Sequence, residues 1–216
     1  SAENVNSNDI EDRLQTTITL LDNGRFELNQ KYYTGALVDQ PNLYSEELLV
    51  LLETTAEDLR DANNDYVWQC KVAKAMQRLA EKIIWHVLDD LYEKTKTTNL
   101  VLAGGFFMNS VINGKITNNT KFKNVYISHS PDDLGNSIGA ALYLNHCILG
   151  QARKKKQSVS NLGPEFTSQE IENVITRRKV VGKKLSNPEK SIAEILAKGE
   201  VVALLQGRME FGDRAL

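Results

Sequence analysis

Two adjacent glycines, Gly104 and Gly105, stand where a phosphate group can approach the main chain. They follow a short apolar run, residues 99–103, and precede a segment that can be helical. Glycine has no Cβ to block a ligand, and the start of a helix offers unpaired N–H donors and a favourable dipole. The same pair also suits a tight strand-to-helix turn. Asn109, shortly after the pair, either donates to a nucleotide or caps the helix, and the spacing leaves both roles open.

Two aspartates, Asp132 and Asp133, lie between a second apolar segment, residues 124–128, and a helix that begins near Leu134. Ligands of open α/β sheets bind at the carboxyl ends of parallel strands. An aspartate at this place therefore either binds a metal ion or N-caps the following helix.

Three charged side chains near the end of the sequence, Arg208, Glu210 and Arg214, follow an apolar run and have glycines between them. Arginine binds a phosphate or another oxyanion through two parallel hydrogen bonds, and Glu210 can orient one of the guanidinium groups. A solvated charged turn with an internal ion pair is the alternative.

The histidines and cysteines are scattered: His86, His129, His146, Cys70 and Cys147. No two histidines are four residues apart, as a zinc or iron site on one helix needs, so we expect no complete metal site within the chain. His129 is the histidine nearest to Asp133. The cysteines fall in two different predicted helices, and we expect separate core thiols, as in a reducing cytoplasm.

The elements that must position these groups alternate between helix and strand. Residues 66–95 carry apolar side chains at steps of three and four, the pattern of one long amphipathic helix. A strand buried on both faces (99–103), a helix (106–116), a second strand (124–128) and a helix (134–149) are predicted next. Crossovers of this length predict parallel strands in an α/β sheet covered by helices.

A basic, Ser-rich linker over residues 151–163 divides the chain. We predict a first domain over residues 10–150, which begins with a hairpin that turns at Asp22-Asn23-Gly24, and the start of a second α/β domain over 164–216. The first nine or so residues are polar and without periodicity, and they are left out of the fold assignment.

In the second domain, Thr167 and Glu170 form a capping box that opens a helix ending near Arg178. A helix over 188–198 and a strand over 200–205 follow. So short a domain rarely has a sufficient core, so we expect the chain to be a fragment of a longer protein.

The composition is that of an ordinary globular protein. The 216 residues include 26 Lys and Arg and 28 Asp and Glu, which gives a net charge of -2. This balance argues against a basic nucleic-acid-binding protein, and the run at 153–156 is expected to be a solvated linker. No apolar run approaches the ~18 residues of a membrane span, and we expect a soluble, cytoplasmic protein.

Three segments resemble motifs of one family. LVLAGGFFMNS (100–110) and SPDDLGNSIGAALY (130–143) resemble LAGGVALN and GDAGTALGAALY of the O-carbamoyltransferases of nodulation-factor and antibiotic biosynthesis. ALLQGRMEFGDRAL (203–216) resembles the GRMEFGPRALG motif of the same proteins. The resemblance runs in order from about Thr16 to the last residue.

The resemblance implies an actin-like ATPase domain (ribonuclease H-like), related to the tRNA threonylcarbamoyltransferases, followed by a YrdC-like domain. In that family the YrdC-like domain joins carbamoyl phosphate to ATP, and the first domain passes the carbamoyl group to a substrate hydroxyl with the help of a bound divalent metal, iron in the parent enzymes. By this resemblance Gly104, Gly105 and Asn109 belong to the nucleotide-binding loop, and Asp133 binds the metal. Arg208, Glu210 and Arg214 open the site for carbamoyl phosphate and ATP.

The sequence departs from the family pattern at several points. Asp213 replaces a proline, residues 106–108 are bulkier than usual, and the metal-binding histidine pair is missing. The leading hypothesis is a fragment of an O-carbamoyltransferase, inactive by itself, whose partners are carbamoyl phosphate, ATP and a hydroxyl-bearing acceptor, with neither membrane nor nucleic acid. A threonylcarbamoyltransferase-like tRNA-modifying protein and a non-catalytic nucleotide-binding module are the alternatives.

Overall fold

The structure is a computed structural model, and it describes residues 6–34, 43–58, 66–153, 160–212 and 215. The chain divides into two compact units. Unit 1 consists of Ser1–Val101 and Asn109–Tyr126, and unit 2 of Leu102–Met108 and Ile127–Leu216. The segment with the two glycines therefore belongs to unit 2, while Asn109 belongs to unit 1. The division into domains at residues 151–163 stays a prediction.

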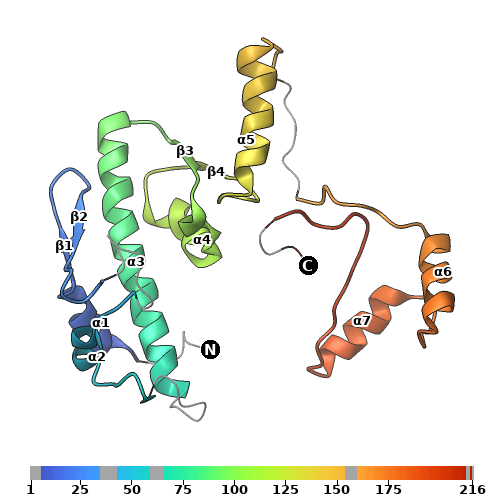
Figure 1. The fold of residues 1–216 in the computed structure, drawn as a ribbon, viewed down its shortest axis with the longest axis horizontal. Coiled ribbons are helices and arrows are strands. Elements are labelled where there is room, and N and C mark those ends of the chain that lie inside the picture. The colour runs from blue at the N-terminus through green and yellow to red at the C-terminus, as the bar shows by residue number, and fades with distance from the viewer. Residues whose placement is uncertain (1–5, 35–42, 59–65, 154–159, 213–214, 216) are drawn as a thin grey trace. The chain divides into compact units, whose positions relative to one another are not determined.

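The long helix of unit 1, α3, spans Tyr66–Thr95, the bounds that the apolar spacing predicts. Helices α1 (Asn8–Gln15) and α2 (Glu46–Leu51) lie along one side of it (Figure 1). Residues in and next to these helices share a core, whose buried members are Ile10, Leu14, Leu48, Leu52, Ala75 and Leu79. Most of α1 follows the polar first nine residues, and the sequence analysis assigns no element to its range.

The predicted hairpin is confirmed. Strands β1 (Ile18–Leu20) and β2 (Phe26–Leu28) pair antiparallel. Their turn lies over residues 22–24, because the Leu21 amide donates to the Arg25 carbonyl at 2.9 Å. The φ angles in this turn are 63° at Asn23 and 68° at Gly24, values that asparagine and glycine tolerate better than other residues. The turn packs on α3, because the His86 Nε2 lies 2.8 Å from the Leu21 carbonyl oxygen.

The second part of unit 1 is a strand, a helix and a strand. β3 (Asn99–Leu102) pairs with β4 (Asn124–Ile127), and α4 (Ser110–Asn119) connects them. The strands begin side by side, since the Asn124 Nδ2 donates to the Asn99 Oδ1 at 2.9 Å, which is the arrangement of parallel strands. The expectation that β3 is buried on both faces is wrong. Its residues alternate between exposed and buried, with Val101 73% exposed, because the described sheet has two strands and one covered face.

The described residues of unit 2 form three α-helices, which the sequence predicts in part or in full. Helix α5 (Gly135–Tyr143) is shorter than expected, because the chain continues as a π-helical turn over Leu144–Ile148. The capping box of α6 (Ser168–Arg178) is confirmed, with hydrogen bonds in both directions between Thr167 and Glu170. Helix α7 (Pro188–Ala197) also lies where it is predicted.

The strand predicted over residues 200–205 does not form. This segment has no strand partner among the described residues, and its apolar side chains are open to solvent, with Val201 97% exposed. A strand is stabilised by its neighbours in a sheet, and an apolar run without a neighbour stays irregular.

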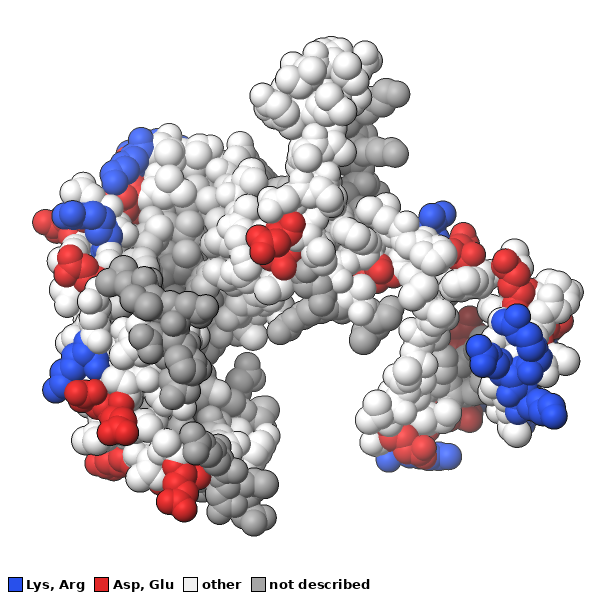
Figure 2. Space-filling view, in the orientation of Figure 1, with Lys and Arg blue, Asp and Glu red and all other residues white. Residues whose placement is uncertain are grey.

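Side chains at the surface agree with the composition. Figure 2 shows Lys and Arg interspersed with Asp and Glu on the visible face of unit 1.

Cys70 and Cys147 are both free thiols, as predicted, but Cys147 is exposed and is not a core residue. Among the helices that the structure describes, none combines the length and the apolarity needed to cross a membrane.

Candidate functional site

The glycine loop, residues 103–108, leaves β3 and enters a 3₁₀ helix, η3 (Gly105–Met108). Gly104 has a φ of 107°, which L side chains rarely adopt, and no atom lies within 4 Å of the position that a Cβ would take there. Its amide donates to the Pro131 carbonyl at 2.6 Å, and its carbonyl accepts from the Phe107 amide at 3.0 Å. Gly104 therefore makes the strand-to-helix turn, and the side on which a Cβ would project is open.

The aspartate loop, residues 130–135, lies against the glycine loop in unit 2. A Cβ added at Gly105 would lie 3.8 Å from the Cβ of Asp132, an ordinary contact. Together with the bond between Gly104 and Pro131, this contact brings the two predicted site segments together. Gly135 closes the aspartate loop, since a Cβ there would lie 2.2 Å from the Ser130 carbonyl oxygen.

The two aspartates have different surroundings. The Asp132 Oδ1 accepts from the Leu134 amide at 3.1 Å, so this side chain holds the turn before α5. The Asp133 side chain is exposed and has no hydrogen bond or ion pair with any described residue. Asp132 does not cap α5, whose N-cap is Leu134 and has no side-chain hydrogen bond. Asp133 is the carboxylate that is available to a ligand.

Residues 211 and 212 contact His129, which directly precedes the aspartate loop. The ring of Phe211 meets the ring of His129 edge to face, with centroids 5.8 Å apart. A Cβ at Gly212 would lie 3.0 Å from the His129 carbonyl oxygen. Beneath this contact, both ring nitrogens of His129 and the Oγ of Ser130 are buried and have no partner among the described residues.

The charged side chains of this last segment lie at the surface. Arg208 and Glu210 are exposed, and the structure shows no ion pair between them, so the alternative of an internal ion pair is not realised for this couple. Arg214 lies outside the described residues, as does Asp213. The role of Arg208, Glu210 and Arg214 in binding carbamoyl phosphate and ATP stays a prediction.

Asn109 is the N-cap of α4, in unit 1. Its Oδ1 accepts from the Ile112 amide at 3.1 Å, and its Nδ2 donates to the Gln77 Oε1 on α3 at 2.8 Å. The capping role that the sequence left open is therefore present, and its role in nucleotide binding stays a prediction. Gln77 has no sequence signal for such a role, because its spacing in α3 is that of an ordinary polar helix position.

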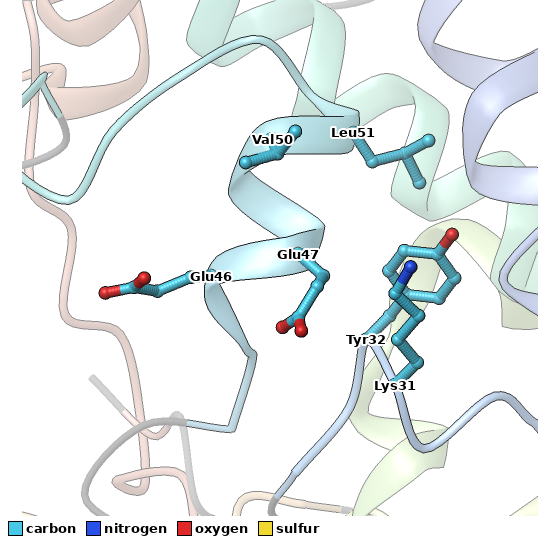
Figure 3. Close-up of a pocket in the computed structure, with 6 residues that line it drawn as sticks. All are labelled: Lys31, Tyr32, Glu46, Glu47, Val50 and Leu51. Carbon is cyan, nitrogen blue, oxygen red and sulfur yellow. The ribbon is translucent and has the colours of Figure 1, made fainter.

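A separate cavity of about 520 Å³ lies in unit 1 and is lined by Lys31, Tyr32, Glu46, Glu47, Val50 and Leu51. In Figure 3 the carboxylate of Glu46 points away from Lys31 and Tyr32, and Glu47 lies between Glu46 and these two residues. A hydrogen bond within Glu47 and one with Ser45 hold the pKa of Glu47 below its usual value. None of the predicted site residues lines this cavity.

The described residues contain no group of three or more His, Cys, Asp and Glu side chains that could hold a metal ion. His86 contacts hairpin carbonyls, and the His146 Nδ1 lies 2.8 Å from the Gln151 carbonyl oxygen, so both rings make structural contacts. The side chains of the described residues do not form a complete metal site. Asp133 can supply one carboxylate to a site whose other ligands lie elsewhere.

Comparison with known proteins identifies the family. The family model described as "Carbamoyltransferase N-terminus" matches residues 3–142, so the chain belongs to the carbamoyltransferase family. An uncharacterized protein of Synechocystis is 39% identical over 153 residues, which are 67% of this chain and 25% of that protein.

Two further relatives are nodulation proteins. NolNO of Sinorhizobium fredii is 30% identical over 148 residues, which are 67% of this chain and 22% of that protein. NolO of Bradyrhizobium diazoefficiens is 29% identical over 148 residues, 67% of this chain and 27% of that protein. The matched part of the chain thus spans about a quarter of the length of these relatives.

Proposed function

We propose that this chain is part of an O-carbamoyltransferase that forms carbamoyl adenylate from carbamoyl phosphate and ATP and transfers the carbamoyl group to a substrate hydroxyl. The family match and the similarity to two nodulation proteins support the transferase. We further propose an actin-like ATPase fold for the first domain and a YrdC-like fold for the second.

The observation that carries the proposal is the meeting of the glycine loop and the aspartate loop in unit 2. Gly104 presents an exposed main chain with open space where a side chain would project, which is the geometry that a phosphate needs to approach a backbone. Preorganised backbone dipoles are effective at stabilising charge that develops on phosphate or acyl oxygens. The exposed Asp133 carboxylate lies in the neighbouring loop.

The proposed metal would be a divalent ion, iron in the parent enzymes, held by Asp133 together with ligands from outside the described residues. When bound, such an ion polarises a carbonyl oxygen or binds the acceptor hydroxyl. In the protein extended to the length of these relatives, Asp133→Ala should lose bound metal and carbamoyl transfer but keep adenylate formation. Equal loss of both half-reactions would make Asp133 a structural residue.

The nucleotide part of the proposal is tested on this chain with a fluorescent ATP analogue, mant-ATP, by titration to saturation. We expect saturable binding that unlabelled ATP displaces. Absence of binding at millimolar mant-ATP would overturn nucleotide binding by this chain.

The same preparation tests the expectation that the chain is inactive by itself. We expect no carbamoyl-phosphate-dependent release of pyrophosphate from ATP, because the described residues hold no complete set of metal donors and none of those in 164–212 is buried. Pyrophosphate release above the level of a heat-denatured sample would contradict that expectation.

A further inference from the structure

We infer that Gln77 of α3 is a positioning residue that fixes the orientation of the Asn109 side chain, and that Glu81 and Lys115 in turn fix Gln77. The inference deepens the proposed function and rests on it where it concerns nucleotide binding. Its basis is a set of hydrogen bonds between α3 and the start of α4, all of them within unit 1.

Four side chains form one continuous chain of hydrogen bonds. The Asn109 Nδ2 donates to the Gln77 Oε1 at 2.8 Å, and the Gln77 Nε2 donates to the Glu81 Oε1 at 2.9 Å. The Lys115 Nζ donates to the same Glu81 oxygen at 2.6 Å. The Glu81 side chain is 13% exposed, so this end of the chain is largely withdrawn from solvent.

The chemistry of the two ends leaves one arrangement for the amides between them. An ionised carboxylate only accepts and a backbone amide N–H only donates. Gln77 must therefore turn its NH₂ group toward Glu81, which directs its oxygen toward Asn109. Asn109 must turn its oxygen toward the Ile112 amide, which directs its NH₂ group toward Gln77.

This orientation determines what Asn109 can offer to a ligand. A side-chain amide has two donor hydrogens and two acceptor positions, and the network uses one of each. One donor and one acceptor remain, each on a fixed side of the group. Turning the amide over would exchange the two and would remove the cap of α4, so Gln77 sets which atom of Asn109 faces which neighbour.

The network also forms part of the wall of a cavity of about 360 Å³ between α3 and α4. Gln77, Glu81 and Lys115 all line this cavity. Three cations line the cavity, and each has a carboxylate near it: Lys115 pairs with Glu81, Arg78 pairs with Glu11, and Lys74 also acts on the Glu11 carboxylate, so the cavity by itself is not an anion site. Gln77, in the polar wall of this cavity, instead accepts a hydrogen bond from Asn109, the residue at which the glycine loop joins α4.

Two variants separate positioning from capping. Asn109→Asp keeps an oxygen that accepts from the Ile112 amide but cannot donate to Gln77. Gln77→Met keeps a similar side-chain length but loses both of its hydrogen bonds. We expect each variant to weaken mant-ATP binding about tenfold, the effect of one directional contact, with little change in the thermal midpoint of Asn109→Asp. Gln69→Met, at an exposed position of the same helix, is the matched control and should bind as the wild type does.

A rescue distinguishes orientation from general damage. In the double variant Asn109→Asp/Gln77→Lys, the ammonium group at position 77 can donate both to the carboxylate at position 109 and to Glu81. We expect this variant to protect the Ile112 amide from hydrogen exchange as the wild type does, whereas its mant-ATP affinity stays low, because a carboxylate at position 109 has no hydrogen to donate to a nucleotide. A merely structural role of Gln77 predicts no such protection, because two substitutions would then add their damage.

Hydrogen exchange, measured without nucleotide, tests the positioning independently of the proposed function. In Gln77→Met the Ile112 amide should exchange faster than in the wild type, while amides in the middle of α3 keep their rates. If the wild type binds no mant-ATP, the proposed function fails, and the exchange rates still decide whether Gln77 positions Asn109. Unchanged Ile112 exchange in Gln77→Met, or unchanged affinity in both single variants of a chain that binds mant-ATP, would overturn the inference.

Discussion

Alanine substitutions at Gly104 and Gly105 should separate two properties of the glycine loop, the stability of its turn and its affinity for a phosphate. Gly104→Ala should lower the stability, and Gly105→Ala should lower the affinity. At Gly104 the φ of 107° lies outside the regions that alanine adopts easily, although nothing obstructs the added methyl group. At Gly105 the added Cβ would make ordinary contacts at 3.8 Å with the Asp132 Cβ and the Met108 Cε. One glycine is thus required by backbone conformation, and the other has room for a side chain.

The magnitudes follow from these two environments. Holding an L residue in a sparsely populated backbone region costs about 1–3 kcal/mol, so Gly104→Ala should lower the free energy of unfolding by that amount. Replacing glycine at a compatible position stabilises by about 0.4–1 kcal/mol through the unfolded chain, so Gly105→Ala should be neutral or stabilising. If a phosphate approaches the main chain at Gly105, the same methyl group should weaken mant-ATP binding about tenfold, a loss of about 1.4 kcal/mol.

Urea unfolding and mant-ATP titration of the wild type and both variants measure the two quantities. A Gly105→Ala variant that is as stable as the wild type but binds mant-ATP less well supports the phosphate interpretation. If it binds mant-ATP as the wild type does, no phosphate approaches the main chain at Gly105. Equal destabilisation by the two substitutions would refute the reasoning about φ.

Three further outcomes are expected. Ser130→Ala should raise the free energy of unfolding by about 1 kcal/mol in urea, because the buried Ser130 Oγ has no partner among the described residues; a loss of stability would mean that the hydroxyl is satisfied. Hydrogen bonds from Lys121 and Lys96 lower the pKa of Glu93 to about 2, so the stability that this group contributes should be complete above its ordinary pKa of 4.5 and lost as pH falls through about 2. NMR titration should show this pKa rise toward 4.5 in Lys121→Met, and an unmoved pKa would contradict the cause. In the protein extended to the length of its relatives, Arg208→Lys should raise the half-saturating carbamoyl phosphate concentration at least tenfold, since lysine lacks the planar fork; an unchanged value would leave Arg208 a solvated side chain.

Elements with strong local signals could be predicted from the sequence. The apolar spacing gave α3 its bounds, the Asn23-Gly24 pair specified the hairpin turn, and the Thr167–Glu170 pair started α6. In each case the interactions that form the element join residues that are close in the sequence. The same sequence does not predict α1, whose stability depends on the burial of Ile10 and Leu14 against α3, far along the chain.

The candidate site was predictable by segment and not by side chain. The spacing placed Gly104 and the aspartate pair after two neighbouring strands, and the structure brings their loops together. The sequence spacing could not tell which aspartate holds the turn and which carboxylate stays free, because that choice depends on one hydrogen bond, from the Leu134 amide to Asp132. Gln77 was equally out of reach, since its contact with Asn109 joins residues 32 positions apart.

In residues 164–212, local sequence signals predict the helices but not a core. Helices α6 and α7 have well-formed caps and amphipathic sequences, yet none of the described residues in this range is buried. On α6 the side chains of Ile171, Val174 and Ile175 are 38–49% exposed. Complete burial of such a side chain contributes about 1.5–3 kcal/mol, and in these three it is realised only in part. Capping and periodicity therefore fix where the helices begin and end, whereas a core requires apolar surface from outside this range, as α3 provides for α1 in unit 1.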